Sequence, residues 1–227
     1  LVQHLRIVPS ERIVIVPNAI ELESPPPASV DLRAELGIDT ETPLVGSVGR
    51  LVRQKAPEVF VRACARVAAS VPQARFVLVG GGPLEGLVTS EIASAGLDDR
   101  FLLLRGFDEG ERIMGQFDVF ALPSRYEAGA AFAPMEAMRA GTPVVVTDVV
   151  GSRDAVEHGR SGFVVPPDDS AALADAVTRL LVDPALRRAF SDAGRRRVEE
   201  RFDIRMAAVG IAEVYGSLAR GEAERNR

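Results

Sequence analysis

The chain has 227 residues, 47% of them hydrophobic, and a mean hydropathy of +0.10, so it can bury one large core or two small ones. A formal charge of −5 and a pI near 5.2 argue against a nucleic-acid partner, which would require a basic surface. No apolar run reaches membrane-spanning length, no signal peptide opens the chain, and a single cysteine excludes an internal disulfide.

These features predict a reducing, cytoplasmic setting. Cys64 falls on an apolar helical face with Phe60 and Val67, which indicates a buried, inert thiol rather than a nucleophile. The first residue is Leu1 rather than methionine, so we expect a fragment of a longer chain or a processed product.

Apolar runs of strand length alternate with helical patterns along most of the chain. We predict strands at 12–16, 43–48, 75–79, 101–104, 119–122, 143–147 and 162–165. We predict one helix that starts at Pro57 and another that runs from the glycine-rich turn to about residue 95. Further helices are predicted at 110–116, at 134–140, in an amphipathic segment around 173–181, at 184–201 and at 204–219. Three consecutive prolines make 24–28 a turn-rich segment.

The predicted strands are apolar throughout rather than alternating, which is typical of a parallel sheet buried on both faces. The fold class is therefore α/β, a doubly wound, Rossmann-like domain with C-terminal helices. Ligands of such domains bind beyond the carboxyl ends of the strands. The loops expected there are 49–57, 80–84, 105–108, 123–134 and 148–152.

Several common catalytic motifs are missing from the sequence. Neither a phosphate-binding G-x-x-x-x-G-K-[ST] loop nor a G-x-S-x-G nucleophile elbow is present. The turn 80–83 does not match the dinucleotide fingerprint G-x-G-x-x-G, because Glu85 stands where its third glycine belongs. His4 and His158 have no partner at ligand spacing, and no Asp-x-Asp occurs, so a metal centre is not supported.

Lys55 is the only lysine among 27 basic residues, the others all being arginine. Lysine is a compact point charge, whereas arginine is a planar fork that binds two oxygens at once. A single lysine in the loop after a predicted strand points to an anion, although chance retention explains it equally well. Arginines 187, 188, 195, 196, 197 and 201 are interspersed with acidic residues, so we interpret them as a solvated helix surface rather than a membrane-binding face.

The run PSRYEAGAAFAPMEAMRAGTP at 123–143 predicts a strand end, a loop of small residues and a helix starting near Pro134. The backbone amides of Gly129, Ala130, Ala131 and Phe132 would form a cradle for an anion, aided by the helix dipole. Glu127 and Glu136 bracket this loop. Simpler explanations exist for both: a solvated loop for Glu127, and for Glu136 a stabilising place in the first helical turn worth about 0.3–1 kcal/mol.

Taken together, these loops predict a diphosphate site. A diphosphate on the 129–132 cradle would lie over the sheet edge that also carries Arg50 and Lys55. Arg50 would hold two phosphate oxygens and Lys55 would supply a movable point charge. Both would act most strongly as negative charge develops on a leaving diphosphate.

In these segments the chain resembles the GT-B retaining glycosyltransferases known as group 1 or family 4. Each motif is weak alone, and the six in order make the resemblance specific over nearly the whole chain. They are VPNAI at 16–20, VGRL at 48–51 with Lys55, VGGGP at 79–83, DVFALPS at 118–124, EAM-x-AG-x-PVV at 136–145, and G-x-x-GF at 159–163.

The resemblance implies a C-terminal domain that binds a nucleotide-sugar donor, UDP- or GDP-linked, without a cofactor or metal. It also implies retention of anomeric configuration, with phosphate oxygens helping to deprotonate the acceptor hydroxyl. The implied catalytic residues are Glu127, which contacts the transferred sugar, and Arg50 and Lys55 on the diphosphate. The implied donor-binding set has four parts. Gly49, Arg50, Lys55 and Gly82 belong to the loops after the first strands, with Arg50 and Lys55 on the diphosphate, and Arg105, Gly106 and Phe107 take the base. Gly129, Ala130, Ala131 and Phe132 hold the diphosphate and sugar, and Glu136 holds the ribose.

One departure from the family pattern concerns the two glutamates. The family places seven residues between them, whereas eight separate Glu127 from Glu136. Either the loop bulges by one residue and Glu127 reaches the usual place, or Ala128 occupies that slot and the first contact is lost.

A second departure is that nothing corresponds to the acceptor-binding N-terminal domain. We expect 1–10 to be the end of the interdomain connection, 11–202 the donor-binding domain, and 203–227 a helix that packs back toward the missing domain. That domain would bind a glycan, lipid or small-molecule acceptor, with peripheral membrane association as one setting of the full enzyme. The chain as given would then bind donor weakly and transfer nothing. Two alternatives remain open, an epimerase-like GT-B enzyme and a non-catalytic nucleotide-sugar-binding subunit, while a nicotinamide-dependent oxidoreductase fits poorly.

Overall fold

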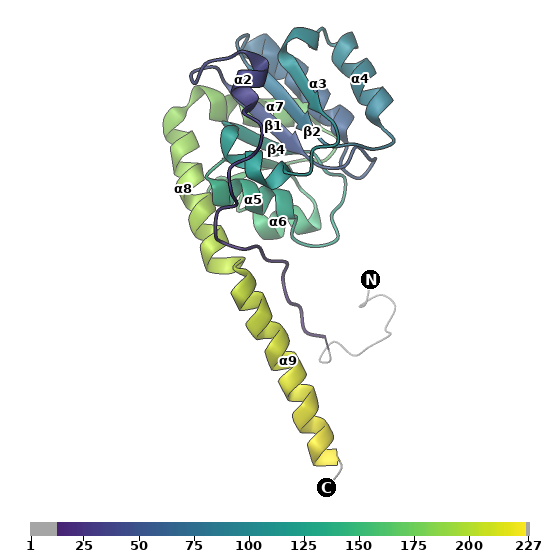
Figure 1. The fold of residues 1–227 in the computed structure, drawn as a ribbon, viewed down its shortest axis with the longest axis vertical. Coiled ribbons are helices and arrows are strands. Elements are labelled where there is room, and N and C mark those ends of the chain that lie inside the picture. Colours follow the sequence, from purple (N-terminus) through teal and green to yellow (C-terminus); the bar gives the residue numbers. More distant parts are fainter. Residues whose placement is uncertain (1–12, 226–227) are drawn as a thin grey trace.

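The computed structural model describes residues 13–225 of the chain. Its centre is a sheet of six parallel strands in the order β3-β2-β1-β4-β5-β6 (Figure 1). The order reverses between β1 and β4, and in doubly wound sheets the ligand crevice lies at this reversal. The strands are β1 Leu44–Val48, β2 Arg75–Val79, β3 Phe101–Leu104, β4 Val119–Leu122, β5 Val144–Thr147 and β6 Gly162–Val165.

Helices cover both faces of the sheet. One face carries α3 Pro57–Ser70, α4 Glu85–Ser94 and α7 Ser170–Val182, and the other carries η3 Gly110–Gln116, α5 Phe132–Ala140 and α8 Pro184–Arg201. The remaining elements are α2 Leu32–Leu36, η2 Asp98–Arg100, α6 Val150–Ala155 and the C-terminal α9 Ile204–Arg225.

Each strand contributes to two hydrophobic cores, which explains why the strands are apolar throughout. In β2, Phe76 and Leu78 pack into the core under α3 and α7, while Val77 and Val79 pack into the core under η3 and α5. Successive side chains of a strand point to opposite faces, so a sheet covered on both sides needs apolar residues at every position. The predicted doubly wound α/β fold is confirmed.

Six of the seven predicted strands form, but the first does not. Residues 13–16 of the expected strand 12–16 lie in an extended segment without strand pairing, and residue 12 lies outside the described part. This β-branched run lies instead beside the start of α9 and stays largely exposed, Val14 at 64% and Ile15 at 85%. Val14 and Val16 line a groove of about 650 Å³ with Met206 and Gly210. The expected connection at 1–10 also lies outside the described residues.

Several helices differ from the prediction, and α9 extends to Arg225 rather than to about residue 219. Helix α5 begins at Phe132, two residues before the predicted start, so Pro134 is its third residue. Proline is tolerated there because the first amides of a helix have no intrahelical acceptor. Helix α6 replaces most of the expected loop 148–152, and α2 was not predicted.

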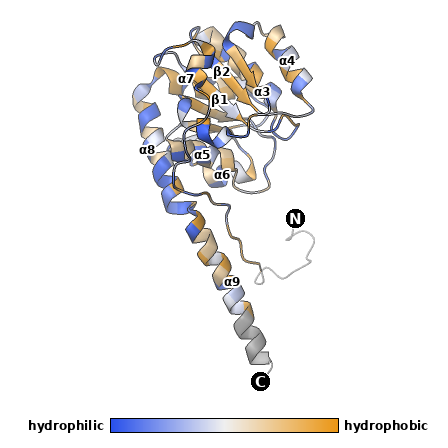
Figure 2. Cartoon of the chain, viewed as in Figure 1, coloured by the Kyte–Doolittle hydropathy of each residue, from blue (hydrophilic) through white to orange (hydrophobic). Residues whose placement is uncertain are grey.

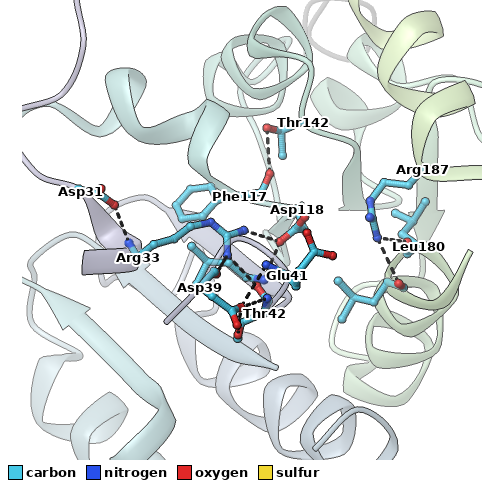
Figure 3. A network of polar contacts seen from close by, with 12 residues as sticks. Asp31, Arg33, Asp39, Glu41, Thr42, Phe117, Asp118, Thr142, Leu180 and Arg187 are labelled. Carbon is cyan, nitrogen blue, oxygen red and sulfur yellow. Dashed lines mark hydrogen bonds and ion pairs between the residues drawn. The ribbon is translucent and has the colours of Figure 1, made fainter. Parts of the chain in front are cut away.

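An ion-pair network closes the amino edge of the sheet, opposite the ligand loops. Figure 3 shows Arg33 between the segment that precedes β1 and Asp118 at the start of β4, with its Nη2 2.9 Å from Asp118 Oδ2. The Leu44 amide donates to the same oxygen at 2.9 Å, and Arg33 also donates to the carbonyl of Thr42 at 2.8 Å. Asp118 therefore fixes β1 against β4 and belongs to the scaffold.

The arginine cluster of α8 has a structural role. Three of its arginines donate to carbonyls at the carboxyl ends of other helices: Arg187 to Leu181 of α7 at 3.1 Å, Arg195 to Ala140 of α5 at 3.1 Å, and Arg197 to Ala155 of α6 at 2.7 Å. Cations are favourable at helix carboxyl ends, where carbonyls lack intrahelical partners. Figure 2 shows α8 as a mostly hydrophilic helix along the side of the domain.

Helix α9 projects away from the body of the domain (Figure 1). It exposes Met206, Val209, Ile211 and Tyr215, and Figure 2 shows hydrophobic residues on it and on the neighbouring extended segment. Between residues 13 and 225, no helix combines the length and the apolar character that a membrane crossing needs.

Candidate functional site

The loop after β1 and the turn after β2 meet through their backbones at the carboxyl edge of the sheet. The Leu51 amide donates to the carbonyl of Gly81 at 2.9 Å. A Cβ atom at Gly80 would lie 2.0 Å from the carbonyl oxygen of Gly49, and one at Gly82 would lie 2.6 Å from that of Leu51. The two loops can approach this closely only because Gly80 and Gly82 have no side chain. Gly49 and Gly82, both predicted site residues, therefore lie at one junction.

Lys55 and Glu127 are in direct contact. The Lys55 Nζ lies 2.5 Å from Glu127 Oε1, and the two side chains are 21% and 8% exposed. The pair joins the loop after β1 to the loop after β4, across the point where the strand order reverses. Arg50 stands at the start of the first loop with an exposed side chain. The sequence placed Lys55 and Glu127 in one pocket but did not predict that they pair.

Glu127 points back toward the loop after β1, and Ala128 is exposed to solvent. The Gln54 side-chain amide donates to the carbonyl of Tyr126 at 3.1 Å and lies 3.4 Å from Glu127 Oε2. These contacts hold the backbone before Glu127 beside the backbone before Lys55. Despite the additional residue in the loop, the carboxylate of Glu127 thus reaches Lys55.

The loop 129–131 before α5, called here the small-residue loop, is contacted by Asn18 and by Gly151 of α6. Asn18 Nδ2 donates to the carbonyl of Ala130 at 2.9 Å, and a Cβ atom at Gly151 would lie only 1.7 Å from the carbonyl oxygen of Gly129. Ala130 and Ala131 are buried, whereas Phe132 is exposed. Ala131 is the N-cap of α5, and in the described part of the chain no side chain caps this helix. Its first amides are thus available to an anion.

Glu136 lies in the second turn of α5, not the first. Because the helix starts at Phe132, Glu136 is its fifth residue. It lies four positions after Phe132 and therefore on the same side of the helix. The explanation that it stabilises the first turn is therefore wrong. Burial raises the pKa of Glu136, the nearby negative charge of Glu111 raises it further, and Arg139 opposes both effects. Hydrogen bonds donated to this half-buried carboxylate would stabilise its charged form.

The expected base-binding loop follows β3. Arg105 turns toward α4, where Nε pairs with the carboxylate of Glu85 and Nη2 lies 3.4 Å from the Thr89 hydroxyl. Gly106 has φ +61°, a left-handed conformation that glycine adopts at little cost. Phe107 is half-buried against the core beneath it. The Arg105 side chain is therefore engaged with α4.

The cysteine and the described histidine are part of the scaffold. Burial raises the pKa of the Cys64 thiol well above its usual range, as expected of an inert buried thiol. His158 Nδ1 accepts a hydrogen bond from the Val164 amide at 3.0 Å, and His4 lies outside the described residues. Among residues 13–225, no cluster of histidine, cysteine and acidic side chains is arranged to hold a metal ion.

Sequence reasoning missed three residues that support the site. Asn18, Gln54 and Arg125 each bond to a loop distant in sequence. Asn18 lies inside the VPNAI motif and Arg125 inside the run 123–143, so the sequence pointed to their neighbourhood but not to their contacts. Gln54 carried no signal beyond its place before Lys55.

The fold and these loops define a doubly wound domain of the nucleotide-binding type. At the carboxyl edge of its sheet it carries Lys55, the carboxyl groups of Glu127 and Glu136, and the uncapped N-terminus of α5. Comparison with known proteins then identifies the family. Residues 30–197 match the model of the family "Glycosyl transferases group 1", and the chain belongs to this family. It is the Rossmann-like, C-terminal type of domain of GT-B proteins.

Relatives of known activity are similar over most of this chain. The chain is 35% identical over 211 residues to a 2-deoxystreptamine glucosyltransferase of Streptomyces kanamyceticus, covering 89% of the chain and 54% of that protein. It is 32% identical to an alpha-maltose-1-phosphate synthase of Mycolicibacterium smegmatis, covering 92% of the chain and 58% of that protein. The chain thus spans about half the length of these relatives.

Solved structures agree with the fold. The structure resembles sucrose-phosphate synthase from Thermosynechococcus elongatus with a TM-score of 0.79 and 31% identity, over 91% of this chain and 52% of that one. It also resembles Anabaena HepE in complex with UDP and glucose, with a TM-score of 0.75 and 27% identity, over 82% of this chain and 51% of that one.

Proposed function

We propose that this chain is the donor-binding domain of a retaining glycosyltransferase, which transfers a sugar from a nucleoside diphosphate sugar to an acceptor hydroxyl. The observation that carries the proposal is the Lys55–Glu127 pair at the reversal of strand order. It sets a cation and a carboxylate side by side in the crevice where doubly wound domains bind nucleotides. Membership of the group 1 family supports the same assignment.

In this proposal the diphosphate binds between Lys55, Arg50 and the start of α5. The amides of Phe132 and Ala133 are the first of an uncapped helix and would donate to phosphate oxygens. Lys55 and Arg50 would neutralise the charge that grows on the diphosphate as it leaves. We propose that these groups suffice without a divalent metal, so that EDTA leaves the dissociation constant of a nucleoside diphosphate unchanged.

Glu127 would change partners when the donor arrives. In the structure its carboxylate holds Lys55. A phosphate competes for the same ammonium group, and the released carboxylate can then accept a hydrogen bond from a hydroxyl of the transferred sugar. Because Glu127 pairs with Lys55 while Ala128 is exposed to solvent, we propose that Glu127 fills the role of the first glutamate of the family and that the loop absorbs the additional residue.

The nucleoside would lie beyond the diphosphate. We propose that Glu136, half-buried on the same side of α5 as Phe132, accepts hydrogen bonds from the ribose hydroxyls. The backbone of Gly106 and Phe107 would contact a uracil or guanine base. The sugar transfer breaks the bond between the anomeric carbon and the phosphate oxygen and forms one to the acceptor oxygen on the same face. The acceptor proton passes to an oxygen of the leaving diphosphate.

The acceptor site would be supplied by the part of the relatives' length that this chain does not span. The exposed apolar residues of α9 and of segment 13–16 are available to pack against such a partner domain. We therefore propose that the chain by itself binds donor without transferring sugar to an acceptor.

The test is a thermal-shift panel of nucleoside diphosphate sugars, because a ligand that binds only the folded state raises the apparent melting temperature. We expect at least one UDP- or GDP-linked sugar to raise Tm of the wild-type chain and to raise it less in Lys55→Met. If no nucleoside diphosphate or its sugar raises Tm at millimolar concentration, the proposal is wrong. A full-length protein whose Glu127→Gln variant keeps full transfer activity would contradict the proposed contact between Glu127 and the transferred sugar.

A further inference from the structure

Arg125 connects three segments that are far apart in the sequence. Its Nη2 lies 2.7 Å from Glu58 Oε1, its Nε donates to Asp168 Oδ1 at 2.7 Å, and its Nη1 donates to the carbonyl of Arg53 at 2.9 Å. These partners belong to the first turn of α3, the loop between β6 and α7, and the loop after β1. The planar guanidinium has donors in the fixed directions that three separate acceptors require.

The carboxylate of Glu58 makes this contact strong. Glu58 is only 7% exposed, and within the described residues its Oε2 has no hydrogen-bond partner. A buried carboxylate needs a cation, so Glu58 fixes Arg125 in one place. Asp168, which is exposed, holds the other edge of the guanidinium. The guanidinium of Arg125 is therefore held in one orientation by its three partners.

Arg125 is hydrogen-bonded to the backbone just before Lys55. The Arg125 backbone amide donates to the carbonyl of Gln54 at 2.8 Å, in addition to the bond from its side chain to Arg53. Lys55 follows Gln54 directly, and Glu127 lies two residues after Arg125.

Beyond Lys55 the backbone is strained. Ala56, fully buried, has φ +48°, a left-handed conformation that costs a residue with a side chain about 1–2 kcal/mol. Such strain persists only where surrounding contacts over-determine the backbone. The bonds from Arg125 to residues 53 and 54 are contacts of this kind, and they set where the Lys55 side chain starts.

We propose that Arg125 is a positioning residue for the donor diphosphate: through residues 53 and 54 it holds Lys55 where the ammonium group can pass from Glu127 to a phosphate oxygen. This inference rests on the proposed function. Arg125 does not itself contact the ligand in this account, because its guanidinium is already bonded to Glu58, Asp168 and Arg53.

The test compares two ligands, a nucleoside diphosphate and the matching monophosphate, by calorimetry on the chain. The readout is the ratio of their affinities, which isolates the contribution of the second phosphate. We expect Arg125→Met and Lys55→Met each to lower this ratio by about tenfold, the size of one charge-assisted contact. The double variant should lower it no further than Lys55→Met alone, because the two residues act through one contact.

Two additional variants keep the result interpretable. Arg125→Met leaves Glu58 as a buried, unpaired charge. The double variant Glu58→Gln, Arg125→Met removes this charge as well, and it should lower the affinity ratio by the same factor as Arg125→Met. Arg62→Met is the matched control: Arg62 pairs with Glu91 on the exposed outer side of α3, and the ratio should stay at the wild-type value.

The outcomes separate the two proposals. If Lys55→Met leaves the ratio unchanged, the proposed diphosphate site is wrong. If Lys55→Met lowers the ratio but both Arg125 variants retain the wild-type ratio, or if the effects of Lys55→Met and Arg125→Met multiply in the double variant, the positioning role is wrong. A merely structural Arg125 would weaken both ligands together and leave their ratio unchanged.

Discussion

Lys55 and Glu127, 72 residues apart in the sequence, form a largely buried ion pair in which Nζ lies 2.5 Å from Oε1. The ammonium group that we propose to bind phosphate is thus held by a carboxylate in the absence of a ligand. This arrangement keeps both charges compensated in the unliganded domain, and it makes the carboxylate a competitor of the diphosphate.

Glu127→Gln should tighten the binding of a nucleoside diphosphate, because the neutral amide competes less for the ammonium group of Lys55. We expect an improvement of about two- to fivefold, because the amide oxygen of glutamine can still accept a hydrogen bond from Lys55 and only part of the ion-pair energy is removed. Isothermal titration of UDP and GDP into the two forms of the chain measures it.

The same substitution should abolish most sugar transfer in a full-length protein, because the sugar loses its carboxylate contact. An affinity for nucleoside diphosphate that falls in Glu127→Gln contradicts the competition. Glu157→Gln is a control for the loss of one negative charge, since Glu157 is exposed and pairs with Arg160 on the far loop.

Glu136→Gln should stabilise the chain near neutral pH. The raised pKa of Glu136 means that the folded state binds its proton more tightly than the unfolded state does. Stability from this group is therefore fully present below the usual pKa of 4.5 and is lost as pH rises through the folded pKa. The glutamine variant avoids that loss, so we expect a rise in Tm on the order of 2 °C at pH 7.

The gain should disappear well below pH 4.5, where both states of the wild-type chain are protonated. Thermal melts of both forms between acid and neutral pH measure this. A gain of equal size at every pH would show that the carboxyl charge is not its cause. The variant should also bind nucleotide sugars more weakly if Glu136 holds the ribose, so stability and binding should move in opposite directions.

Gly151→Ala should damage the site through the backbone. Its new Cβ atom would lie 1.7 Å from the carbonyl oxygen of Gly129, so α6 or the small-residue loop must move. We expect a loss of about 1–3 kcal/mol in the free energy of unfolding, measured by denaturant titration, together with weaker nucleotide binding.

Gly86→Ala is the matched control, because a methyl group there would meet open space on α4. Helix propensity predicts that it leaves stability unchanged or raises it slightly. Wild-type stability and binding in Gly151→Ala would mean that the loop is looser than its close packing indicates.

The sheet could be predicted from the sequence because apolar runs covered on both faces leave a strong local pattern. Strands 43–48 to 162–165 follow from it, and so does the convergence of their loops at one edge. The run at 12–16 has the same composition, yet residues 13–16 lie beside α9, largely exposed, and pair with no strand in the described part. Composition alone does not distinguish a strand from an extended segment that pairs with no sheet.

The contacts within the site could not be predicted in the same way. Arg125 reaches Glu58 and Asp168, 67 and 43 residues away, and no local pattern encodes such pairings. Pro134 suits the first position of a helix, but it occupies the third in α5, where a missing amide proton is equally harmless. The lone lysine was a useful sign, because its chemistry differs from that of arginine, but its ion-pair partner became visible only in three dimensions.

The most direct measurement for the whole account is a calorimetric titration of a nucleoside diphosphate into the wild-type chain and Lys55→Met, with the free nucleoside as the reference ligand. We expect Lys55→Met to weaken the affinity for the diphosphate by about tenfold or more and to leave the affinity for the nucleoside unchanged, because one charge-assisted phosphate contact is removed. Equal affinities of the two proteins for the diphosphate would contradict it.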